Sequence, residues 1–264
     1  AARCLAVWIP YAASSYQAIT TIQTIVLKEL PTSATFGHVY GCLLYTALKE
    51  VHVKEAVQPA QNLPPQKPGA PPHDSAGILG FKIYDSLESI LEHLSSIWSK
   101  VAQKRESRDS VAATFISFYS RISLAYLEKK LSFILAHLFT LVSHPNTRLY
   151  GADTDEAKST VSHILRSGIL SNFTEDGKRL VFKELVSMLD AATSTAAAAT
   201  PTANAAIDAI RVSSLLTEIY SLFSEVGESV VDVVSASSGN SIEDILLRLI
   251  SQQQTLISSP QHKA

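Results

Sequence analysis

Apolar residues recur along most of this chain at the spacing of an amphipathic α-helix. Between residues 83 and 101, large apolar side chains fall at offsets 0, 4, 7, 8, 11, 14, 15 and 18, on one face of a helix with about 3.6 residues per turn. The opposite face carries Glu88, Glu92 and Lys100. Similar patterns predict helices over 34–55, 76–104, 109–125, 126–143, 153–168, 174–190, 206–234 and 241–257.

Local signals mark where several of these helices begin and end. His-Pro-Asn at 144–146 stops one helix, because Pro has no N–H and disfavours helix in the residue before it. The run 153–156 (Asp-Thr-Asp-Glu) predicts a capping box that starts a helix reaching about Arg166, with Gly168 as its stop. Acidic residues in 174–176 open the next helix, and Ser-Ile-Glu-Asp at 241–244 opens the last one.

Two segments differ from this helical pattern. Residues 56–76 hold six of the eleven prolines and predict an extended loop. Residues 191–205 are rich in Ala and Thr and predict a low-complexity linker. The best local strand candidate, Val-Val-Asp-Val-Val at 230–234, lies in a helical context and favours helix. The predicted organisation is a helical segment 1–55, the loop 56–76, helical repeats 77–190, the linker 191–205 and a helical pair 206–264.

Pairing consecutive helices gives a regular arrangement. Each helix pair takes about 40 to 50 residues, which is the period of HEAT and armadillo repeats. A pair cannot bury both of its faces alone, so stacked pairs would share one continuous core. We therefore expect an all-α fold, an α-solenoid of antiparallel helix pairs, with a compact helical bundle as the alternative. The predicted pairs are 34–55 with 76–104, 109–125 with 126–143, 153–168 with 174–190, and 206–234 with 241–257.

Composition narrows the class of protein. Of the 264 residues 46% are hydrophobic, which is too many for a disordered chain, and the net charge of -2 gives no general attraction to nucleic acid or anionic lipid. Two cysteines, Cys4 and Cys42, exclude a disulfide scaffold and a zinc ribbon. We find no secretory signal and no apolar run long enough to span a bilayer, so we expect a cytoplasmic protein. The start at Ala1 and the single Met188 suggest a segment of a longer array.

One region of the chain resembles a known family. Tyr126-Leu127-Glu128-Lys129, followed by Phe133, Leu135 and His137 and then by Leu-Val-Ser-His-Pro at 141–145, is similar to a helix in the HEAT-repeat accessory proteins of the clathrin adaptor complex at the trans-Golgi network and endosomes. The order of the surrounding features also looks similar: Ala2, Arg3 and Cys4 upstream, a helix like 87–98, and a pair like 211–226 with 242–257 downstream.

The resemblance implies a non-catalytic scaffold within a very long solenoid. Such a scaffold would bind the clathrin adaptor and its accessory factors in endosome-to-Golgi traffic, and would sit peripherally at Golgi and endosome membranes through these partners. Other helical-repeat scaffolds, such as a transport receptor or a cochaperone assembly factor, are the alternative. An all-α enzyme or lipid-binding domain would need a pocket with converging polar groups, of which the sequence gives no sign.

Histidine and cysteine provide few candidates for a metal site. His137 and His144 are seven residues apart without an acid or Cys partner at helical spacing. His38 and Cys42 share a helix face, but a buried Cys in a packed helix is favoured over a metal ligand. Gly37 and Gly41, at the same spacing, predict a close approach of another helix.

Charged clusters have simpler explanations than a site. The acids of 153–156 lack the pattern of a calcium loop, and Glu-Asp-Gly-Lys at 175–178 lacks the second Gly of a phosphate loop. Lys100, Lys104 and Arg108, with Arg105 between them, indicate a solvated helix end, with a patch for an acidic partner as the alternative. The sequence therefore predicts no catalytic, cofactor-binding or metal-binding residues.

Overall fold

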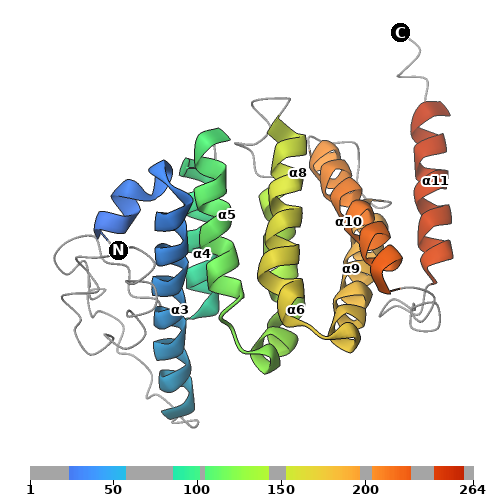
Figure 1. Ribbon diagram of the computed structural model, residues 1–264. Helices are drawn as coiled ribbons and strands as arrows, with labels where there is room; N and C mark the ends of the chain where they lie inside the picture. Colours follow the sequence, from blue (N-terminus) through green and yellow to red (C-terminus); the bar gives the residue numbers. More distant parts are fainter. Residues whose placement is uncertain are drawn as a thin grey trace, which may run out of the picture. The chain divides into compact units, whose positions relative to one another are not determined.

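The structure, a computed structural model, describes residues 24–57, 86–101, 105–142, 153–196, 204–226 and 241–258. These residues are almost entirely helical, so the predicted all-α class is confirmed for the described part of the chain (Figure 1). The chain divides into two compact units, residues 1–121 and residues 122–264. The solenoid arrangement stays a prediction, and each unit is described by itself.

The first unit is built around one close helix pair. A short 3₁₀ helix η2 (Leu30–Thr32) leads into α3 (Ala34–Val57), which is followed by α4 (Leu87–Val101) and α5 (Arg105–Tyr119). Helix α3 packs most extensively on α5, and α4 contacts both of them. Aromatic side chains fill the core of this unit, all of them fully buried: Tyr40, Trp98, Phe115, Phe118 and Tyr119.

Two glycines set the distance between α3 and α5. A Cβ added at Gly37 would overlap the carbonyl oxygen of Ser110, and one added at Gly41 would overlap that of Thr114. Only glycine allows two helix backbones to come this near, because any side chain would occupy the space of the partner's backbone. The close helix approach predicted from the spacing of these glycines is confirmed.

The second unit holds five α-helices among the described residues. They are α6 (Leu124–Val142), α8 (Asp153–Ile164), α9 (Glu175–Ala196), α10 (Asn204–Val226) and α11 (Ile242–Ser258). Helix α9 packs chiefly on α10, α6 contacts α8, α9 and α10, and α11 packs on α9. The core of this unit therefore lies among α6, α8, α9 and α10, with α11 added on one side.

The predicted helix pairs are wrong. The main partner of α3 is α5 and not α4, and α9 packs chiefly on α10 and not on α8. The predicted pair 206–234 with 241–257 is also wrong, because α11 packs on α9. The predicted pair 109–125 with 126–143 is divided between the two units. An apolar stripe tells which face of a helix is buried, but it does not name the helix that covers it.

Two predicted helix ends need correction. The helix expected over 109–125 ends at Tyr119, and α6 begins at Leu124, where the carbonyl of Ser123 accepts hydrogen bonds from the next turn. The helix expected to stop at Gly168 continues instead through a π-helical turn, η3 (Leu165–Ile169), and a 3₁₀ turn, η4 (Leu170–Asn172). Gly168 is buried within this turn, so close packing explains it better than a helix stop.

The predicted linker is also too long. Helix α9 extends to Ala196, so residues 191–196 are helical, and α10 begins at Asn204. The strong helix propensity of Ala prevails there over the interleaved Thr residues. Thr193 is buried, and its hydroxyl donates a hydrogen bond of 2.9 Å to the carbonyl of Asp190. Residues 1–23, 58–76 and 230–234 lie outside the described residues, so the predictions made for them stay untested.

The starts predicted for α8, α9 and α11 agree with the structure, whereas the helix expected from residue 76 begins at Leu87 and the one expected from residue 109 begins at Arg105. At the start of α11 the backbone N–H of Asp244 donates to the hydroxyl of Ser241 (3.2 Å), while the N–H of Ser241 donates to the Asp244 carboxylate (3.1 Å). This is the reciprocal pair of a capping box. Helix α8 begins at Asp153, and α9 begins directly after Thr174, as the acidic signals predicted.

Candidate functional site

Helix α11 is attached to the second unit along one side. Its Ile245 is fully buried. The Arg248 guanidinium donates to the Asp190 carboxylate on α9 over 2.9 Å and to the hydroxyl of Ser194 over 2.8 Å. The Asp190 side chain is 8% exposed, so this ion pair is partly shielded from water and fixes the rotation of α11 on α9.

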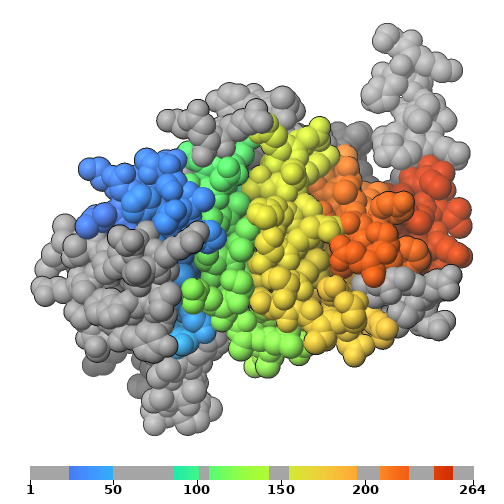
Figure 2. Space-filling view, viewed as in Figure 1, coloured from blue at the N-terminus to red at the C-terminus, as the bar shows by residue number. Residues whose placement is uncertain are grey.

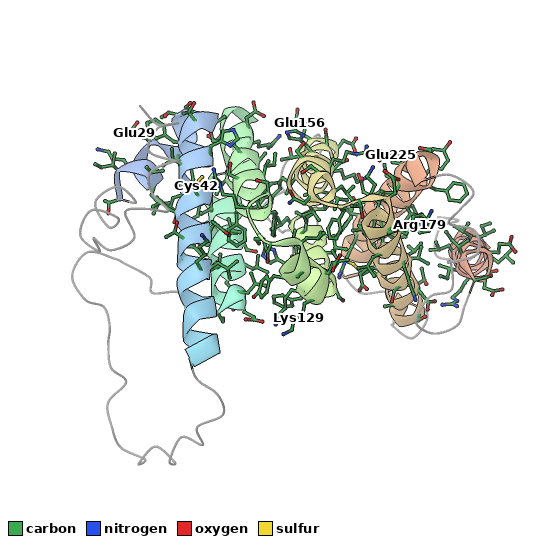
Figure 3. All side chains as sticks on the ribbon, turned by 60° about the horizontal axis from the view of Figure 1, so that its bottom comes forward. Glu29, Cys42, Lys129, Glu156, Arg179 and Glu225 are labelled. Atoms are coloured by element: carbon green, nitrogen blue, oxygen red, sulfur yellow. The ribbon has the colours of Figure 1, made fainter. Side chains whose placement is uncertain are left out.

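The other side of α11 presents apolar residues to solvent. Leu246, Leu247 and Ile250 are exposed by 39%, 62% and 56%, and their spacing brings them together on one stretch of helix surface. We call these three residues the α11 face. Figure 2 shows α11 at the edge of its unit, and Figure 3 shows its side chains projecting outwards. Large apolar side chains grouped on a surface are typical of interaction sites.

Helix α10 adds two exposed aromatic residues. Tyr220 is 79% exposed and Phe223 is 41% exposed. The ring of Phe223 lies against the ring of Phe182 on α9, with a centroid distance of 6.3 Å. Phe223 is therefore partly committed to the α9–α10 contact, whereas most of the Tyr220 side chain faces solvent.

Most of the α11 face could not be expected from the sequence. Ile242, Ile245, Leu246, Leu249 and Ile250 form one apolar stripe on a helix, which predicts that all five are buried, yet Leu246 and Ile250 are exposed. The stripe of α11 is wider than a single partner helix can cover, and α9 takes only the side with Ile245 and Arg248. The sequence feature that could have revealed the exposed residues is the width of this apolar stripe, because a helix that packs on one neighbour buries a narrower stripe.

The residues weighed as metal ligands are used in packing. Cys42 on α3 is buried, and burial raises the pKa of its thiol while Arg121 opposes that rise (Figure 3). His38 Nδ1 lies 2.5 Å from the Ser117 hydroxyl on α5. The described residues contain no cluster of three His, Cys, Asp or Glu side chains that could hold a metal ion. His137 lies in α6, and His144 falls outside the described residues.

The charged clusters resolve into local contacts. Lys178 pairs with Glu175 over 2.9 Å, which raises the pKa of Lys178 through their hydrogen bond, and Arg179 pairs with Asp176 over 3.0 Å. These pairs lie within the first turns of α9 and stabilise its N-terminal end. Arg108 is buried, which is contrary to the prediction that the basic residues between 100 and 108 form a solvated helix end.

Comparisons with known proteins assign no family to this chain. This chain matches no protein family, no curated protein and no solved structure. Within the described ranges, none of the helices combines the length and the apolar character that crossing a membrane requires.

Proposed function

We propose that this chain is a non-catalytic helical scaffold that binds proteins, and that its partners act in clathrin-adaptor-dependent traffic between endosomes and the Golgi. The observation that supports protein binding is the α11 face. Three large apolar side chains stand exposed on a helix whose rotation is fixed by a shielded ion pair. An apolar surface on a helix held in this orientation would bind well, because less conformational entropy is lost when a partner covers it.

The chemistry of the α11 face fits an amphipathic helix of a partner protein. A partner helix with apolar residues at i, i+3 and i+4 would cover Leu246, Leu247 and Ile250. Glu243, one turn earlier on α11, is exposed and would favour a basic residue at the end of the partner helix. The resemblance of residues 126–145 to clathrin adaptor accessory proteins supports the identity of the partner. Association with Golgi or endosome membranes would then be peripheral and mediated by the adaptor.

Charge substitution on the α11 face tests this proposal. In a pull-down of the clathrin adaptor complex from cytosol, Leu247→Glu with Ile250→Glu should reduce adaptor capture by about tenfold or more, because two apolar contacts at the centre of an interface are lost. The matched control is Leu180→Glu on α9, which is also an exposed leucine at 41% but lies outside the α11 face. Unchanged helix content and melting temperature establish that each variant is folded.

The partner and the surface can be tested separately. Adaptor capture that is equal in the wild type and in the double variant would contradict the α11 face as the binding surface. Cross-linking that recovers nuclear transport cargo or chaperone complexes, and no adaptor, would contradict the adaptor assignment and favour the other scaffold classes.

A further inference from the structure

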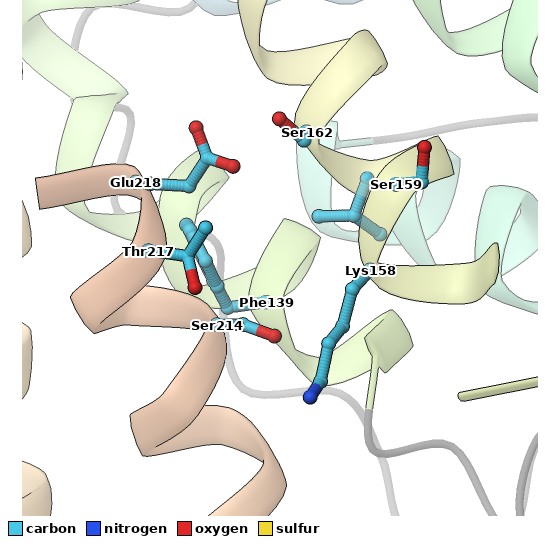
Figure 4. A pocket seen from close by; sticks show the side chains of 8 residues that line it. Phe139, Lys158, Ser159, Ser162, Ser214, Thr217 and Glu218 are labelled. Carbon is cyan, nitrogen blue, oxygen red and sulfur yellow. The ribbon is translucent and has the colours of Figure 1, made fainter. Parts of the chain in front are cut away.

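We draw no further inference here: the strongest candidate, the half-open pocket between α8 and α10 (Figure 4), carries nothing, because its two charged residues, Lys158 and Glu218, already form ion pairs within the chain and nothing in the structure shows what would fill it.

Discussion

The two units of this chain hold their helices together in different ways. In the first unit, Gly37 and Gly41 bring the backbones of α3 and α5 into direct contact. In the second unit, Lys158 on α8 and Arg166 on η3 reach α10 through side-chain contacts with Ser213 and Glu225, and a half-open pocket lies between α8 and α10. Backbone contact tolerates no added atoms, whereas side-chain contact can leave space for another molecule.

Buried polar groups differ in how well they are hydrogen-bonded. In the first unit the hydroxyl of Tyr40, fully buried on α3, lies 2.6 Å from Nε2 of His93 on α4. In the second unit the hydroxyl of Ser214 and Oε2 of Glu218 have no hydrogen-bond partner among the described residues. A satisfied buried group stabilises a fold, and an unsatisfied one lowers stability. Trp98 Nε1 in the first unit is likewise buried without a hydrogen-bond partner among the described residues, so the two units do not divide on this point.

The glycine contact should give the largest effect. Gly37→Ala combined with Gly41→Ala should destabilise the first unit by about 3 kcal/mol or more, because each added Cβ overlaps a backbone oxygen of α5. In an exposed helix the same change would stabilise by about 0.5–1 kcal/mol per site, so the sign of the effect is diagnostic. Hydrogen exchange should rise in α3 and α5 while α9 and α10 keep their protection.

Cysteine labelling gives a second measurement of this prediction. A Cys4→Ser background leaves Cys42 as the one cysteine of the chain. Cys42 is buried and its raised pKa disfavours the reactive thiolate, so the folded protein should react slowly with a thiol reagent. The double alanine variant should react much faster. Unchanged labelling and unchanged exchange would contradict the close α3–α5 contact.

The α9–α11 ion pair should give an intermediate effect. Arg248→Met leaves the buried Asp190 carboxylate without its guanidinium partner and should cost about 1–2 kcal/mol, less than a fully buried pair because Arg248 is 28% exposed. We expect faster hydrogen exchange in α11 and little change in α10. Substitution of Glu243→Gln, an exposed acid of the same helix, serves as the control and should leave the exchange of α11 unchanged.

The smallest effects should differ in sign between the units. Tyr40→Phe removes the hydrogen bond to His93 and should cost about 1 kcal/mol in denaturant unfolding. Ser214→Ala removes a buried hydroxyl that has no hydrogen-bond partner among the described residues, and should be neutral or stabilising by up to about 1 kcal/mol. Losses of equal size in both variants would contradict the difference between a hydrogen-bonded and an unbonded buried hydroxyl.

Much of the local structure could be predicted from particular residues. The Ser241–Asp244 capping box, the start of α9 after Thr174 and the role of Gly37 and Gly41 all depend on contacts within one turn or on the size of one residue. The α11 face and the half-open pocket could not be predicted in this way. Leu246 has the same apolar character whether a helix covers it or not, and Glu218 looks like any acid on a helix.

The sequence by itself determined that this protein is helical and where many of its helices begin, because helix formation depends on periodicity, propensity and capping within a few residues. Only the tertiary structure decided which helices are partners, as α3 with α5 and α9 with α10. It also decided which apolar side chains remain exposed, among them Leu247 and Ile250. The physical reason is that burial and pairing depend on the shapes of surfaces that meet across many residues of chain, and the pattern of a single helix does not encode its neighbour.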